Sequence, residues 1–141
     1  MTQNGSPEQA ALDKARHDLD DEHQQLRRIV GRMREARDTA TLAAALDELH
    51  PRLKEHFAHE EFPNGLYHSM GALARDHAAE VRELVDEHFQ LLSAVRGLAD
   101  EARRHQGGGP EGLLRNAGAI ADRLRAHEEK ELKLADTLHH R

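Results

Sequence analysis

The sequence contains no cysteine, which excludes several classes of structure and function at once. Without thiols the chain has no disulfide framework, no thiolate zinc site and no cysteine-based catalysis. Aromatic residues are also scarce, with three Phe, one Tyr and no Trp. Charged residues make up 33% of the chain and apolar residues only 38%, which favours long amphipathic helices with charged outer faces over a sheet core. The expected fold class is all-α.

Two further absences bear on partners and location. The formal net charge is -6 and no block of basic residues is present, so neither a nucleic acid nor an anionic membrane is an expected partner. No apolar run approaches the ~20 residues of a membrane span, and the N-terminal residues lack the apolar core of a signal peptide. We therefore expect a cytoplasmic protein with one domain at 7–138, a disordered tail at 1–6 and a short tail at 139–141.

Apolar residues recur every three or four positions in four segments, which predicts four helices. We expect these helices at about 7–37, 40–61, 75–105 and 110–138. Asp38 begins the cap of the second helix. Pro51 lies inside that helix without disturbing its apolar period, so we expect a kink there rather than a break. Residues 62–75 form the longest connection, with a short helical turn expected at about 66–73.

Polar residues interrupt the apolar stripe of two helices in the same way. In the second helix His56 and Glu60 continue a stripe of Leu residues, and in the fourth helix His127 and Glu131 do so again. Burying an unpaired carboxylate costs several kcal/mol or forces it to take up a proton. Inward His and Glu residues one turn apart therefore need partners, and a metal ion would satisfy both.

The other two helices each place one His on the apolar stripe, His23 in the first and His88 in the third. Both follow the dipeptide Asp-Glu. This repeat predicts two helical hairpins, each with a His on its first helix and His-x-x-x-Glu on its second. The two His residues of each hairpin are nearly equidistant from its connecting loop. Because antiparallel helices rise by 1.5 Å per residue, all these side chains should meet at one level.

The predicted cluster contains four imidazoles and two carboxylates. Its members are His23, His56, Glu60, His88, His127 and Glu131. This donor set suits iron, manganese or zinc and is too rich for a single ion, so two metals sharing two bridging carboxylates fit it best. The alternative is a set of His and Glu pairs without metal, which would have to recur on four helices at one level.

The order His, His-x-x-x-Glu, His, His-x-x-x-Glu resembles the hemerythrin-like (His-His-Glu cation-binding) domains over nearly the whole chain. Residues 53–61, Leu-Lys-Glu-His-Phe-Ala-His-Glu-Glu, and 84–88, Leu-Val-Asp-Glu-His, are also similar to that family. The resemblance implies an up-down-up-down antiparallel four-helix bundle that holds two iron ions with a bridging oxide or hydroxide. In the ligand set that the resemblance implies, His23 and His56 bind one iron and His88 and His127 bind the other. Glu60 and Glu131 bridge the two irons.

One position departs from the oxygen-carrying members of that family, which have a further His one turn before the ligand of the third helix. Here that position is Leu84, so both metals would keep an open position. This disfavours reversible oxygen carriage and favours a catalase-like or peroxidase-like reaction with hydrogen peroxide or dioxygen. The alternatives are a protein that binds or senses oxygen or nitric oxide, and a protein that holds iron without catalysis. A redox partner protein is possible, and we expect a monomer or weak dimer.

Four neighbouring polar residues need an interpretation of their own. Tyr67, in the long connection, is a possible extra oxygen donor to the metals, whereas His77 is expected at the end of the bundle. His59 and Glu61 are expected on the outer face, in solvent. The aromatic residues, all close in sequence to a predicted ligand, are expected to wall a dry pocket: Phe57, Phe62, Tyr67 and Phe89.

Overall fold

The computed structural model describes residues 7–61, 77–105 and 111–139. Within these ranges it describes all side chains except those of Leu12, Ala15, Arg16, Leu19, Leu138 and His139. The described residues form the helices α1 (Pro7–Glu35), α2 (Thr39–Glu61), α4 (Ala78–Arg104) and α5 (Glu111–His139). They include no strand, so the all-α prediction is confirmed for this part of the chain.

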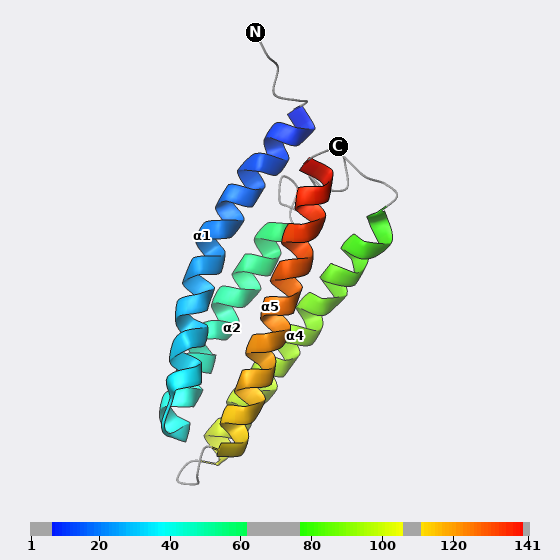
Figure 1. Cartoon of the computed structure of the whole chain (residues 1–141). Helices are drawn as coiled ribbons and strands as arrows, with labels where there is room; N and C mark the ends of the chain where they lie inside the picture. Colours follow the sequence, from blue (N-terminus) through cyan, green and yellow to red (C-terminus); the bar gives the residue numbers. More distant parts are fainter. Residues whose placement is uncertain (1–6, 62–76, 106–110, 140–141) are drawn as a thin grey trace.

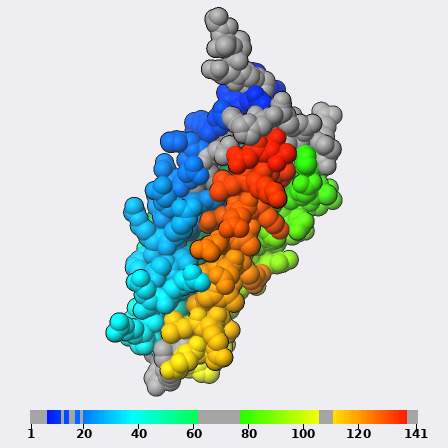
Figure 2. Space-filling model, viewed as in Figure 1, coloured from blue at the N-terminus to red at the C-terminus, as the bar shows by residue number. Residues whose placement is uncertain are grey.

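The helices lie side by side in a bundle (Figure 1). Each described helix contacts two others, through the pairs α1 and α2, α2 and α4, α4 and α5, and α1 and α5. The colours in Figure 1 show that α1 and α4 run in one direction and that α2 and α5 run in the other. The exact up-down-up-down topology stays a prediction, since the connection at 62–76 lies outside the described residues. The space-filling view shows α1 and α5 packed together on the visible face (Figure 2).

Local chemistry explains where the helices begin and end. The backbone N–H of Thr41 donates a hydrogen bond to Oδ1 of Asp38 at 2.6 Å, so Asp38 is the predicted cap of α2. Helix α2 continues through Pro51, so the prediction that Pro51 does not break it is confirmed, while a kink there stays a prediction. Helix α1 ends at Glu35 rather than 37, and α4 begins at Ala78 rather than 75. Helix α5 extends to His139, one residue into the predicted tail.

The apolar core is centred on α2. Four Leu residues of its predicted stripe have no exposed surface, and they are Leu42, Leu46, Leu49 and Leu53. Burying one such side chain contributes about 1.5–3 kcal/mol, so this stripe is a large part of what holds the helices together. The same face of α2 ends in His56 and Glu60, which are also buried. The core therefore continues directly into the polar cluster.

Two positions that continue the three- and four-residue spacing of the apolar residues are less buried than that spacing predicts. Val30 in α1 and Val81 in α4 are only half-buried, and Ile29 takes the core position beside Val30 with 4% of its surface exposed. Helix α1 packs against both α2 and α5, so its buried arc is wider than a single stripe and includes adjacent residues.

The described helices do not have the features of a membrane span. None of them combines the length and the apolar character that crossing a bilayer requires.

Candidate metal centre

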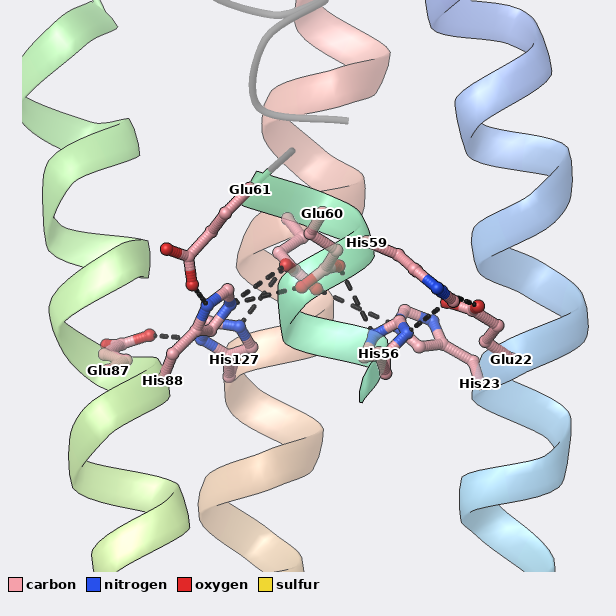
Figure 3. A network of polar contacts seen from close by, with 10 residues as sticks. Glu22, His23, His56, His59, Glu60, Glu61, Glu87, His88 and His127 are labelled. Carbon is pink, nitrogen blue, oxygen red and sulfur yellow. Dashed lines mark hydrogen bonds and ion pairs between the residues drawn. The ribbon is translucent and has the colours of Figure 1, made fainter. Parts of the chain in front are cut away.

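The structure brings the six predicted donors together inside the bundle. They come from all four described helices, and each is at most 3% exposed: His23, His56, Glu60, His88, His127 and Glu131. In Figure 3 the rings of His23 and His56 lie on one side of Glu60, and those of His88 and His127 lie on the other. The convergence that the sequence pattern predicted is therefore present, although it joins residues far apart in the chain.

The donors form two overlapping groups, each with ligand atoms within 4.8 Å of one another. One group is His23, His56, Glu60 and Glu131, and the other is Glu60, His88, His127 and Glu131. Both carboxylates belong to both groups. This arrangement is compatible with a metal site in which two ions share the two carboxylates.

All four imidazole rings direct Nε2 toward the shared carboxylates. The distances from Nε2 to the nearest carboxylate oxygen are 3.4 Å for His56 to Glu60, 3.1 Å for His88 to Glu60, 3.3 Å for His127 to Glu131, and 3.7 Å for His23 to Glu131. A ring nitrogen that carries no proton is the form that binds a metal. In that form the ring proton is on Nδ1.

Three further carboxylates hold the proton on Nδ1 in three of the rings. The Nδ1–H of His56 donates to Glu22, that of His88 to Glu61, and that of His127 to Glu87, each at 2.6 Å. A carboxylate on Nδ1 keeps the proton there and leaves the lone pair of Nε2 facing the cluster, as it does around bound metals. These outer carboxylates are thus part of the site.

Sequence reasoning missed these outer carboxylates. Glu61 and His59 are exposed, as expected, but Glu61 also bonds to His88, with its side chain 34% exposed. His59 also has a partner, since its Nδ1 lies 2.7 Å from a carboxylate oxygen of Glu22. Glu22 and Glu87 each precede a predicted ligand in the repeated Asp-Glu-His segments, and that repeat was the available signal.

A family model described as Hemerythrin HHE cation binding domain matches residues 14–135. The chain belongs to this family. Comparison with curated proteins and with solved structures gives no significant match. The protein is thus a hemerythrin-like cation-binding domain with a buried His and Glu cluster that is compatible with a metal site.

Buried polar atoms in this hemerythrin HHE domain lack partners that a cation would provide. Both ring nitrogens of His23 and both carboxylate oxygens of Glu60 are buried without a hydrogen bond of acceptable geometry to the described residues. Each such group costs about 1–3 kcal/mol when left unsatisfied. A metal ion placed among them would remove that cost, so the residues fit the metal that the family name describes.

The two shared carboxylates differ in their affinity for protons. Burial, and then the charge of Glu131, raise the pKa of Glu60 well above its usual range. Burial opposes ionisation of Glu131 as well, but the nearby imidazoles of His127, His23 and His88 hold its pKa well below the usual range. Glu60 therefore takes up a proton more readily than Glu131 does.

Two of the aromatic residues predicted to wall the pocket are described, but they do not both lie against the cluster. Phe57 lies against the cluster. The centroid of its ring is 3.8 Å from that of the stacked His88 ring and 5.6 Å from that of the His127 ring. Phe89 is 67% exposed, so the expectation that it walls the pocket was wrong. It directly follows His88, and consecutive residues of a helix point in different directions. Phe62 and Tyr67 lie outside the described residues, and the role of Tyr67 stays a prediction.

His77 belongs to neither group of donors. Its Nδ1 lies 2.9 Å from Glu80 in the first turn of α4, and its side chain is 26% exposed. This agrees with the expectation that His77 is not one of the six clustered donors.

Proposed function

We propose that the cluster holds two iron ions, joined by a bridging oxide or hydroxide, and that it consumes hydrogen peroxide. In this proposal His23 and His56 bind one ion, and His88 and His127 bind the other. Glu60 and Glu131 bridge the two ions. The observation that carries the proposal is that two buried donor groups share both carboxylates. The bound ions would supply paired redox chemistry at open coordination positions.

Leu84 favours peroxide over reversible oxygen carriage. It lies on α4 one turn before His88, is 2% exposed, and offers only an alkyl side chain. Among the described residues neither donor group contains a third His, so these residues offer the two metal positions the same number of imidazoles. A bridging substrate such as peroxide could then reach both positions, whereas a carrier needs one position closed.

A cavity near the cluster supports access by a small molecule. A cavity of about 290 Å³ lies between α4 and α5, and Leu84 and Leu134 line it together with polar side chains. Leu84 precedes His88 by one turn, and Leu134 follows Glu131 by nearly one turn, so the cavity lies next to the cluster along both helices. Its size is ample for peroxide or dioxygen. The apolar ring of Phe57 stacks on His88 and covers it on the side of the core.

The reaction is balanced without a further reductant, because one peroxide is oxidised to dioxygen while a second is reduced to two water molecules. The test is the initial rate of oxygen evolution per bound iron in the iron-loaded full-length protein. The Glu131→Gln variant removes a shared carboxylate, and Glu129→Gln is the matched control because Glu129 is exposed and belongs to neither donor group. We expect Glu131→Gln to fall to the rate of free iron and Glu129→Gln to keep the rate of the unmodified protein.

Two outcomes would replace this proposal. If the loaded protein is no faster than free iron and forms an oxygen adduct that is released intact under vacuum, it is a carrier. If it is equally slow, binds many irons per chain and gives them up readily to chelators, it stores iron.

A further inference from the structure

The outer carboxylates follow the internal repeat of the chain within each hairpin. Glu22 precedes His23 on α1 and accepts the Nδ1–H of His56 on α2. Glu87 precedes His88 on α4 and accepts the Nδ1–H of His127 on α5. Each of these carboxylates is also shared with a second group, His59 in the first case and Lys130 in the second. The two hairpins therefore support their second His in equivalent ways.

The contacts between the hairpins break that equivalence. Glu61 follows Glu60 on α2 and accepts the Nδ1–H of His88 across the interface with α4. The corresponding residue, which follows Glu131 on α5, is Leu132. Leu132 has no acceptor to offer to the neighbouring α1. Accordingly, Nδ1 of His23 is buried and has no hydrogen-bond partner among the described residues.

The other nearby carboxylate does not replace the missing one. Glu128 on α5 is buried, with 8% of its surface exposed, and this burial raises its pKa. No hydrogen bond joins it to His23 within the described part of the chain. Among the described residues, His23 is thus the one clustered His whose Nδ1 has no carboxylate partner.

We infer that the two metal positions are inequivalent, with the ion at His88 and His127 held more tightly than the ion at His23 and His56. This rests on the proposed metal cluster. An imidazole whose Nδ1–H bonds to a carboxylate is held in the metal-binding tautomer and is a stronger base. Losing such a partner typically costs 10–100-fold in metal affinity. Both rings of the tighter position have this support, and only one ring of the weaker position has it.

The test is a titration of the metal-free full-length protein with zinc(II), which lacks redox chemistry. Nuclear magnetic resonance of the His ring nitrogens reports which rings bind at each step. We expect the first equivalent to shift the Nε2 signals of His88 and His127, and the second to shift those of His23 and His56 with at least about tenfold weaker affinity. Simultaneous filling, or filling of the His23 position first, would overturn the inference.

Two reciprocal substitutions test the cause. Leu132→Glu supplies the missing acceptor, and we expect the affinity difference to fall below about threefold as His23 gains a hydrogen-bonded Nδ1–H signal. Leu132→Met, which changes the side chain without adding an acceptor, should leave the difference unchanged. Glu61→Leu reproduces the defect at His88 and should equalise the positions by weakening the tighter one. If Leu132→Glu does not fold, as judged by circular dichroism, Glu61→Leu decides the matter alone.

This experiment separates the inference from the proposed function. Ordered binding of two zinc ions, together with no peroxide consumption by the iron-loaded protein, would support the inference and remove the proposed reaction. Unordered binding of two zinc ions would overturn the inference and leave the reaction open. Failure to bind zinc and iron at all would overturn both.

Discussion

Phe57 links the apolar core to the cluster at the level of a single side chain. It is 2% exposed, stacks on His88 and touches the edge of His127. Aromatic stacking adds about 0.5–1.5 kcal/mol to the free energy that burial of the ring supplies. The position of His88 therefore depends on Phe57 from one side and on Glu61 from the other.

We predict that Phe57→Ala lowers the free energy of unfolding by about 3–5 kcal/mol, because it opens a cavity beside the cluster. Phe89→Ala removes the same ring from a site that is 67% exposed and should change stability by no more than about 0.5 kcal/mol. Urea denaturation of the metal-free variants measures both values. Equal effects of the two substitutions would contradict the packing described for Phe57.

The elements depend on caps as well as on burial, and α2 is the clearest case. Asp38 accepts the backbone N–H of Thr41, and this hydrogen bond lowers the pKa of Asp38 below its ordinary value of 3.8. A carboxylate with a lowered pKa in the folded state adds stability above its unfolded pKa. That stability is lost as the pH falls through the lowered value.

We therefore predict that Asp38→Ala melts at a lower temperature than the unmodified protein at pH 7. The difference should shrink as the pH falls below about 4. Asp38→Asn keeps a side-chain acceptor without the charge and serves as the control, so it should lose less at pH 7. Thermal melts followed by circular dichroism at several pH values measure this. An Asp38→Ala variant as stable as the unmodified protein at pH 7 would show that α2 does not need its cap.

For the whole molecule, the cluster makes stability depend on a cation. Four helices contribute buried donors to one small volume, so whatever binds there also ties the helices together. Without a cation, His23 and Glu60 keep buried atoms that have no hydrogen bond to the described residues. Metal binding and folding should therefore be strongly coupled.

We predict that adding zinc(II) or iron(II) at about 100 times its dissociation constant raises the free energy of unfolding by about 2.7 kcal/mol. For a chain of this size the melting temperature should then rise by roughly 5–10 °C. A chelator should reverse the rise, and His127→Ala should abolish most of it. A loaded protein that melts at the same temperature as the metal-free protein would contradict the coupling.

The amino-acid sequence by itself determined which residues point inward. An α-helix repeats every 3.6 residues, so the apolar stripe of α2 indicated the burial of Leu53, His56 and Glu60 without knowledge of any neighbour. The same local rule predicted His127 and Glu131 on α5, and the equal distances from the loops predicted a common level. These features follow from backbone geometry within one helix or one hairpin.

Only the tertiary structure decided which outer side chains serve the cluster. Glu61, expected in solvent, bonds to His88, whereas Phe89, expected to wall the pocket, points to solvent. Residues at the edge of a stripe meet a neighbouring helix or miss it according to how the two helices are rotated and how closely they approach. That rotation is set by the packing of the entire core. For the same reason the sequence did not show that Nδ1 of His23 has no hydrogen-bond partner among the described residues. That feature depends on Leu132, which lies on a different helix.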